Sequence, residues 1–425
     1  MDGKHWLFLK LTYMLKMYLR YCFSCLMMAL SIGLFAQDVV FTENNDTPYG
    51  SDGAGVYNGW LDVMRQRMDK MLDDKLLQTS QLGMMVYDLD TDQVVYAYNE
   101  RQRQRPASVM KLVTSITALD MLGGDYGYST SFCYRGTLQA DTLWGDLYCV
   151  GGFDPTISRS DLRAFADSIR RFGISHIDGM IVLDLTMKDT LSYGNGWCWD
   201  DDNDKLTPLL VDKKDQFLSV FVTELKNAGI SLSVTYAKGK LPQYCTEIYR
   251  HRSSMDKVLN RMMKESDNLY AESMFYQIAK AGSPQTAKAS DASGAMKRLI
   301  HRLGLDPVNY TFADGSGLSL YDYVSAEMIV SLLRHAYSHR DIFEHLYPAL
   351  PIAGVDGTLE KRMTSGPARG NVHAKTGTVT GVSTLGGFCR ASNGHQLCFA
   401  ILNQGVVRAS DGRAFQDKVC DALCR

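Results

Sequence analysis

Ser108 and Lys111 lie one helical turn apart in the stretch RPASVMKLVTSITALDML, which begins at Arg105. Apolar residues follow them at helical spacing, so both side chains are expected on one face near the start of a helix. A serine hydroxyl is a weak nucleophile unless a base activates it, and a lysine amine beside it is a suitable base. The alternative is a helix N-cap with a surface lysine nearby, because serine favours that position.

Two further motifs favour the nucleophile. Ser266 and Asn268 lie at the end of a helical run, in the stretch KESDNLYAESMF, and a KTGT run begins at Lys375, where a strand is expected. The order SxxK, SxN, KTG is the signature of penicillin-binding proteins and serine β-lactamases. A second SxxK pair begins at Ser254, too close to Ser266 to be the first motif in this order, so Ser253 or Ser254 is predicted to cap a helix instead.

These motif residues predict an acyl-transfer reaction. Ser108 would attack a peptide carbonyl while Lys111 accepts its proton, so Lys111 must be neutral. Burial and the neighbouring charge of Lys375 both lower the pKa of such an amine. Ser266 is predicted to relay a proton to the leaving amine, and Asn268 to hold a substrate amide.

The segment after Lys375 is predicted to bind the substrate. Thr376 and Thr378 carry hydroxyls that suit a terminal carboxylate, and Gly377 lies between them. The backbone N–H groups of Ser108 and Thr378 are expected to form the oxyanion hole, where the loss of one donor typically costs about 3 kcal/mol.

Composition places the chain among ordinary globular proteins. Its 425 residues are 45% hydrophobic and 22% charged, with a net charge of −2. Without a basic field, nucleic acid is not an expected partner. The eight cysteines after residue 36 form neither a CxxC pair nor a cluster with zinc spacing, so we predict no metal site and no cofactor.

The first 36 residues are predicted to be a secretory signal peptide. Basic residues between Lys4 and Arg20 precede an apolar run from Cys25 to Ala36, and cleavage is expected near Ala36. The run is shorter than the about 20 residues that a membrane-spanning helix needs. We therefore expect a periplasmic protein with no stable membrane span after cleavage, with an uncleaved anchor as the alternative.

The order of predicted elements indicates an α/β fold with a discontinuous main domain. One β-hairpin is expected within residues 82–100 and another within residues 383–402, and both would share one antiparallel sheet. Residues 125–250 alternate strand-like and helical runs and are predicted to form a smaller mixed α/β inserted domain. Residues 37–124 and 251–425 would together form the peptidase domain.

The second hairpin raises the question of a disulfide. An Asn-Gly pair between two apolar strands is a strong two-residue turn signal. If Ser392 faces His395, then Cys389 lies directly opposite Cys398. A cross-strand disulfide and two reduced core cysteines are both compatible with this pattern.

Most of the chain after the signal peptide resembles the low-molecular-mass class C penicillin-binding proteins, which are D-Ala-D-Ala carboxypeptidase/endopeptidases of the DacB type, peptidase family S13. The matching stretches run from about Arg105 to Leu402: GDLYCVGGFDPTIS, SHIDGMIVLD, GWCWDDD, SDNLYAESMF, FADGSGLSLYDYVSA, LPIAGVDGTLEKRM and HAKTGTVTGVSTLGGF. The resemblance implies a penicillin-binding/β-lactamase-like transpeptidase domain, an antiparallel sheet flanked by helices, interrupted by the inserted domain.

The resemblance also implies a function. It indicates an exported serine DD-peptidase that hydrolyses D-Ala-D-Ala termini or D-Ala-diamino-acid cross-links of peptidoglycan stem peptides through an acyl-enzyme on Ser108. β-Lactam antibiotics would be covalent inhibitors. In relatives, an aspartate matching Asp154 helps to read the side chain of the stem peptide, and Ser316, in the DGSGLS stretch, is a further candidate contact.

Three departures from the family pattern bear on size and specificity. Phe153 stands where relatives usually have glycine, and Leu320 where they often have an arginine that reads the peptide side chain. A simple turn is the alternative role for Asp154. The segment between Trp199 and Phe217 is short, so one inserted domain is expected rather than two.

Two other functions fit parts of the pattern. A serine β-lactamase would need fast deacylation, but no ExxxN motif of the class A kind lies between Ser266 and Lys375. A non-catalytic cell-wall-binding relative would keep the fold, although every motif side chain is present in this chain.

Overall fold

The computed structural model describes residues 51–425 except 202, 234 and 284. The predicted signal peptide, residues 1–36, lies outside the described residues. The compact unit that holds the motif residues spans Val56–Arg425. Within the described part of the chain, no helix combines the length and the apolar character that crossing a membrane requires.

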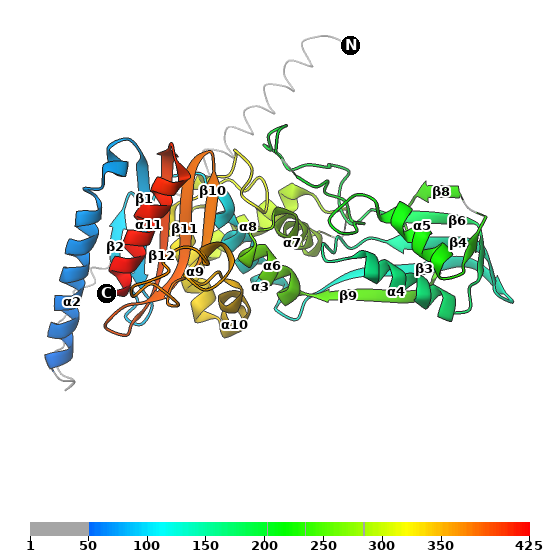
Figure 1. The fold of residues 1–425 in the computed structure, drawn as a ribbon, viewed down its shortest axis with the longest axis horizontal. Helices are drawn as coiled ribbons and strands as arrows, with labels where there is room; N and C mark the ends of the chain where they lie inside the picture. The colour runs from blue at the N-terminus through cyan, green and yellow to red at the C-terminus, as the bar shows by residue number, and fades with distance from the viewer. Residues whose placement is uncertain (1–50, 202, 234, 284) are drawn as a thin grey trace, which may run out of the picture. The chain divides into compact units, whose positions relative to one another are not determined.

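A five-stranded antiparallel sheet is the frame of this unit, with the order β10-β11-β12-β1-β2 (Figure 1). The N-terminal hairpin pairs with the C-terminal one through β1 and β12, where Met84 lies opposite Ile401. The prediction that both hairpins share one sheet is therefore confirmed. The strands are β1 (Gln81–Asp88), β2 (Gln93–Tyr98), β10 (His373–Val379), β11 (Gly381–Arg390) and β12 (Gln396–Val406).

Helices bury both faces of this sheet. Because alternate residues of a strand point to opposite faces, Met84 joins the core beneath α11 (Ala409–Cys424), whereas Met85 joins the core beneath α3 (Met110–Leu122) and α9 (Ala326–Ser338). A strand that is buried on both sides reads as a continuous apolar run, and this explains the sequence LGMMVY.

A second sheet, of mixed direction and seven strands, lies within residues 127–254. β3 pairs antiparallel with β4 and β9, whereas β4 pairs in parallel with β5 and β6. Phe132, Phe165 and Phe221 meet in its core. Its elements are β3 (Gly127–Gln139), β4 (Thr142–Val150), α4 (Arg159–Arg171), β5 (His176–Asp178), β6 (Met180–Asp184), α5 (Phe217–Asn227), β7 (Ser231–Leu232), β8 (Thr235–Lys238) and β9 (Thr246–Ser254).

The segment between β9 and β10 is mainly helical, as predicted. Its first helix begins after Ser254, whose hydroxyl accepts a hydrogen bond from the Lys257 backbone N–H (3.3 Å), so the predicted N-cap is confirmed.

The remaining helices and 3-10 turns are α2 (Ser51–Met71), η1 (Lys75–Gln78), η2 (Ala107–Val109), α6 (Met255–Lys264), α7 (Asn268–Ala281), α8 (Ala289–Arg302), η3 (Pro307–Asn309), α10 (Arg340–Ala349) and η4 (Gly357–Leu359).

The register of the β11–β12 hairpin differs from the prediction. Cys389 pairs with Leu397, not with Cys398. The turn contains three residues rather than two, because the Ala391 N–H donates to the His395 carbonyl (2.9 Å). A shift of one residue moves a side chain to the other face of a sheet, so the two cysteines face different cores and both are free thiols. The predicted pairing of Cys389 with Cys398 is therefore wrong, and of the two alternatives the structure has the two reduced core cysteines.

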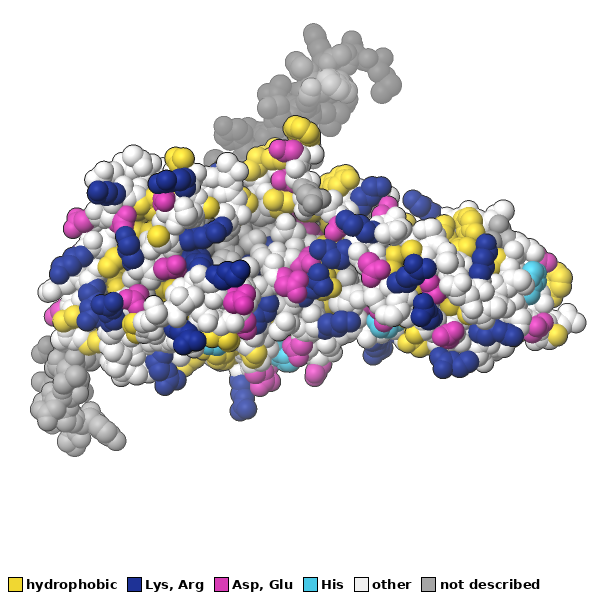
Figure 2. Space-filling view, in the orientation of Figure 1, with side chains coloured by type: hydrophobic (Ala, Val, Ile, Leu, Met, Phe, Trp, Pro, Cys, Tyr) yellow, Lys and Arg dark blue, Asp and Glu magenta, His cyan; other side chains and the backbone are white. Residues whose placement is uncertain are grey.

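Charged side chains of both signs are interspersed on the face of the molecule that Figure 2 shows. Lysines and arginines lie beside aspartates and glutamates there, with no large area of one sign. This distribution agrees with the net charge of −2. The visible face therefore offers no basic stripe of the kind that nucleic acids require.

Candidate active site

Ser108 lies on the 3-10 turn η2, directly before α3. Neither element has a side-chain cap, so the alternative role of Ser108 as a helix N-cap is wrong. Ala107 before it has a φ of 46°, a left-handed conformation that is costly for a residue with a Cβ. The turn presents the Ser108 hydroxyl to Lys111, whose Nζ lies 2.9 Å from Ser108 Oγ.

Lys111 is fully buried, and three oxygen atoms surround its amine. Its Nζ lies 2.9 Å from Ser108 Oγ, 2.8 Å from Asn268 Oδ1 and 2.9 Å from the Ser316 carbonyl oxygen. Burial lowers the pKa of Lys111 to about 8, although nearby carboxylates act in the opposite direction. The neutral amine that a general base requires is therefore accessible near neutral pH.

Ser266 and Asn268 are held by the start of α7. Ser266 has a φ of 59°, and Asp267 caps the helix by accepting a backbone N–H of the first turn (3.1 Å). The Asp267 carboxylate also binds Lys213 Nζ at 2.9 Å and Arg261 Nε at 3.1 Å. These contacts fix the turn that brings Asn268 to Lys111.

Lys375, on β10, forms a second lysine–serine pair. Its Nζ donates to Ser266 Oγ (2.9 Å) and to the Thr376 carbonyl (2.8 Å). Burial, together with the charge of Lys111, holds the pKa of Lys375 well below its ordinary value. The structure thus brings all three motifs together, with a lysine amine beside each serine.

β10 approaches the nucleophile closely because Gly377 has no side chain. A Cβ at this position would lie 2.1 Å from Thr384 Oγ1 and 2.9 Å from the Ser108 backbone nitrogen. Thr384 Oγ1 donates to the Pro106 carbonyl (2.7 Å), which ties β11 to the same turn. Thr378 is exposed, as a residue that binds a substrate must be.

Two other predicted substrate contacts have partners within the protein. Thr376 is half-buried, and its hydroxyl donates to Thr358 Oγ1 (2.7 Å). Ser316 is fully buried and reaches the site through its carbonyl, while its hydroxyl donates to Asp314 Oδ2 (3.2 Å). The structure therefore places Ser316 next to Lys111, but not as a side chain that could contact a substrate.

Asp154 lies on a turn after β4 and is 1% exposed. Its Oδ1 accepts the Thr156 N–H (2.9 Å), and its Oδ2 lies 3.8 Å from His251 Nε2. Phe153 before it has a φ of 54° and packs against Tyr276. Among the residues that the structure describes, no hydrogen bond or ion pair joins Asp154 to the SxxK, SxN or KTG residues. Its Oδ1 makes the contact of a turn residue, whereas its Oδ2 is buried without a hydrogen-bond partner in the described part of the chain.

Two acidic residues that were not selected from the sequence lie close to Lys111. Glu272, on α7, is 1% exposed, and burial raises its pKa to about 8. Asp314 is fully buried and accepts three backbone N–H groups that follow it (3.1, 2.7 and 2.8 Å). The signal for Glu272 was an acidic residue in the apolar run LYAESMF, one helical turn after Asn268.

An open polar pocket of about 340 Å³ adjoins the SxN motif. Ser266 and Asn268 lie on its wall, together with Trp197, Lys213 and Arg261. A larger groove, of about 1030 Å³, lies beside β6 and α5 and contains none of the motif residues. Of the two, only the smaller pocket is lined by motif residues, and these are Ser266 and Asn268.

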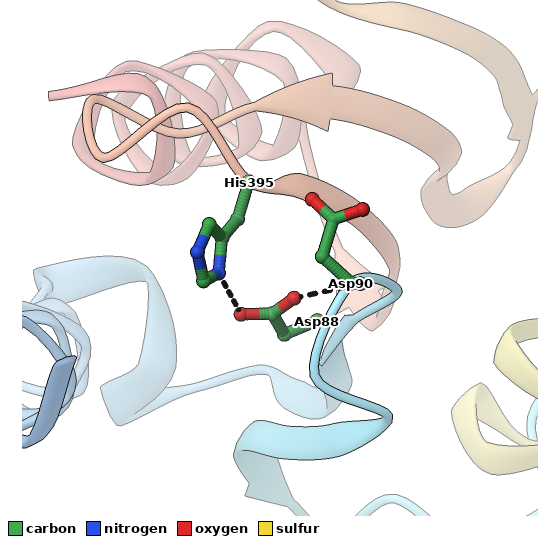
Figure 3. A group of neighbouring side chains, drawn as sticks. All are labelled: Asp88, Asp90 and His395. Carbon is green, nitrogen blue, oxygen red and sulfur yellow. Dashed lines mark hydrogen bonds and ion pairs between the residues drawn. The ribbon is translucent and has the colours of Figure 1, made fainter. Parts of the chain in front are cut away.

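Asp88, Asp90 and His395 form a group of possible metal ligands elsewhere on the sheet (Figure 3). His395 Nδ1 lies 2.7 Å from Asp88 Oδ2, and the Asp90 N–H donates to Asp88 Oδ1 (3.0 Å). Asp90 Oδ2 accepts the Gln396 N–H (2.7 Å). The group links the β1–β2 turn to the β11–β12 turn, and we assign it this structural role.

Comparison with known proteins agrees with the geometry. The model of the D-Ala-D-Ala carboxypeptidase 3 (S13) family matches residues 64–209 and 206–424. The chain belongs to this family. The S13 protein is 26% identical to the D-alanyl-D-alanine carboxypeptidase DacB of Haemophilus influenzae over 413 residues, 77% of this chain and 86% of the relative. It is 26% identical to the D-alanyl-D-alanine carboxypeptidase of an Actinomadura species over 445 residues, 81% of each. It is thus an enzyme of the serine DD-peptidase type.

Solved structures share the fold of this S13 protein. The crystal structure of penicillin binding protein 4 (dacB) from Haemophilus influenzae matches with a TM-score of 0.77 and 23% identity, over 84% of this chain and 98% of the other. A predatory peptidoglycan endopeptidase from Bdellovibrio bacteriovorus matches with a TM-score of 0.53 and 19% identity, over 76% and 86%. The predicted fold class is confirmed.

Proposed function

We propose that this S13 protein hydrolyses D-Ala-D-Ala termini of peptidoglycan stem peptides, D-Ala-diamino-acid cross-links between them, or both, through an acyl-enzyme on Ser108. The observation that carries the proposal is the buried amine of Lys111, 2.9 Å from Ser108 Oγ. Two relatives are named D-alanyl-D-alanine carboxypeptidases, and a Bdellovibrio protein of the same fold is a peptidoglycan endopeptidase.

Acylation begins at Ser108. Its Oγ attacks the carbonyl carbon of the penultimate D-Ala while its proton passes to the neutral Lys111 amine. The carbonyl oxygen becomes an oxyanion, for which the backbone N–H groups of Ser108 and Thr378 are the proposed donors. Lys111 and Asn268 act from α3 and α7, which pack against each other, and Ser108 acts from η2 directly before α3, so little reorganisation is needed during the step.

The leaving amine requires a proton. Ser266 is proposed to relay the proton that Lys111 took from Ser108, so the C–N bond breaks, the amine departs neutral and Lys111 is again a base. Lys375, 2.9 Å from Ser266 Oγ, orients this hydroxyl. In deacylation, water attacks the Ser108 ester while Lys111 accepts a proton, and Ser108 then leaves with that proton.

β-Lactams are proposed as covalent inhibitors of the same residue. Attack by Ser108 opens the lactam ring, and the amine that would leave stays tethered to the acyl group. A structure of the Haemophilus penicillin binding protein 4 contains a β-lactam, and a Bdellovibrio endopeptidase of this fold is acylated by penicillin G. Both observations support penicillin sensitivity here.

We also propose export to the periplasm and a two-part architecture. The signal-peptide pattern in residues 1–36 and a cell-wall substrate support export. Residues 37–124 and 251–425 are assigned to the peptidase domain, and residues 125–250 to the inserted domain. The separate sheets formed by β10-β11-β12-β1-β2 and by β3–β9 support this division.

Purified monomeric and cross-linked muropeptides provide the test, with mass spectrometry as the readout. The protein is expected to remove terminal D-Ala from monomers or to convert dimers to monomers. Ser108→Ala is the matched control and should do neither. Binding of muropeptides without any cleavage would contradict the proposal and support the non-catalytic alternative. Continuous turnover of penicillin would support the β-lactamase alternative.

A further inference from the structure

Glu272 is a buried carboxyl group that the steps above do not use. It lies on α7, one helical turn after Asn268, and is 1% exposed. Its Oε1 accepts the backbone N–H groups of Gly315 (3.0 Å) and Ser316 (2.9 Å). The carbonyl of Ser316 in turn accepts a hydrogen bond from Lys111 Nζ (2.9 Å). A continuous chain of contacts therefore runs from Glu272 through the backbone of Ser316 to the catalytic amine.

The turn that contains Ser316 is tightly held. Thr114 Oγ1 donates to the Gly315 carbonyl (2.7 Å), and Asp314 Oδ1 accepts the Gly317 N–H (2.7 Å). A Cβ on Gly317 would lie 1.8 Å from the Ala107 carbonyl oxygen, so the turn packs directly against η2. Together with the contacts of Glu272, these hydrogen bonds hold the Ser316 carbonyl against Lys111.

The position of that carbonyl decides where the lone pair of Lys111 points. A neutral amine has two N–H donors and one lone pair. Asn268 Oδ1 and the Ser316 carbonyl oxygen are acceptors only, at 2.8 and 2.9 Å from Nζ, so they take the two N–H groups. The lone pair is left facing Ser108 Oγ, 2.9 Å away. Without a fixed acceptor at Ser316, the amine could rotate and donate to Ser108 instead of accepting its proton.

We propose that Glu272 is a positioning residue for acyl transfer, which acts on Lys111 through the backbone of Ser316. The inference rests on the proposed function, in which Lys111 is the base. α7 thus orients the amine twice, directly through Asn268 and indirectly through Glu272. The two residues are four positions apart and project from the same face of the helix.

Glutamine should replace Glu272 well at neutral pH. Burial, reinforced by the neighbouring carboxylate of Asp314, raises the pKa of Glu272 to about 8, so the carboxyl group is mainly protonated there. A glutamine amide oxygen can accept the same two N–H groups. Methionine fills a similar volume but offers no acceptor, and aspartate keeps the acid but shortens the side chain by one methylene.

The experiment compares the wild type with E272Q, E272M and E272D in pre-steady-state labelling by a fluorescent penicillin, which separates initial binding from the acylation rate. E272Q is expected to acylate at close to the wild-type rate. E272M and E272D are expected to acylate on the order of 10²-fold more slowly, the loss that a 1 Å misplacement of a catalytic group can cause, with initial binding unchanged. Ser273→Ala is the control, because Ser273 is buried on the same helix but donates to the Phe153 carbonyl.

Thermal unfolding of each variant reports how much of it is folded. If E272M does not fold, E272D decides the question. Acylation by the folded variants at the wild-type rate would overturn the proposal, as would a loss confined to initial binding. Failure of E272Q to acylate faster than E272D would also overturn it. A failure of the proposed function looks different: the wild type itself would not label, or Ser108→Ala would still label.

Discussion

The acylation rate should depend on pH through Lys111, because only the neutral amine can accept the Ser108 proton. Burial lowers the pKa of Lys111 from 10.5 to about 8, which corresponds to about 3 kcal/mol in favour of the neutral form. With this pKa, about 90% of the amine is neutral at pH 9, about 10% at pH 7 and about 1% at pH 6. Lowering the pH from 9 to 6 should therefore slow acylation by roughly two orders of magnitude.

Stopped-flow labelling with a fluorescent penicillin at constant ionic strength measures this profile. The second-order rate constant for acylation should rise with pH and level off above about pH 8 to 9. Lys111→Arg is the control, because a guanidinium group does not lose its proton in this range, and its rate should be low and nearly flat. A wild-type limb centred near the ordinary lysine value of about 10.4, or no limb at all, would refute the assignment of Lys111 as a buried neutral base.

Three further predictions follow from the packing. Gly377→Ala should slow acylation on the order of 10²-fold, because its Cβ would push β10 away from the Ser108 backbone; an unchanged rate in the labelling assay would argue against the close approach. Mass spectrometry of unfolded, unreduced protein should find no link between Cys389 and Cys398, and a peptide joined at these residues would restore the disulfide. Phe132→Ala should destabilise the protein by about 3–5 kcal/mol in urea unfolding, because Phe132 is fully buried between aromatic rings; a loss below about 1 kcal/mol would contradict the packing.

The chemistry of the site was predictable because each motif is local. Ser108 and Lys111 lie one helical turn apart in the sequence, and this spacing was enough to predict that their side chains lie together. The KTG run lies where a strand was expected. The contacts between motifs were not predictable from physics, since they join segments such as Asn268 and Lys111 that are 157 positions apart. The resemblance to the class C penicillin-binding proteins is what indicated that the three motifs form one site.

The incorrect register of the β11–β12 hairpin and the absence of a cap at Ser108 both have local causes. The turn after Cys389 contains an Asn-Gly pair that fits either a two-residue or a three-residue loop. Only the observed hydrogen bond between Ala391 and His395 selects the three-residue loop. The predicted helix start near Ser108 is correct to within a few residues. Ser108 itself lies on the 3-10 turn η2, which comes before α3, and therefore does not occupy the N-cap position.

The proposed role of Glu272 could not be predicted from the sequence, because Glu272 acts through the backbone of a distant segment. Its partners are the N–H groups of Gly315 and Ser316, which no side-chain pattern marks. An acidic residue inside an apolar helical run indicates a buried polar contact, but not its partner. Asp154 shows the opposite case, in which the family suggested a substrate contact and the structure shows the contacts of a turn.

Peptide mapping after penicillin labelling tests the central claim most directly. The full-length protein is acylated, digested and analysed by tandem mass spectrometry to locate the adduct. We expect one adduct, on Ser108, which is absent in Ser108→Ala. An adduct on Ser254 or Ser266, or labelling that persists in Ser108→Ala, would contradict the assignment of Ser108 as the nucleophile.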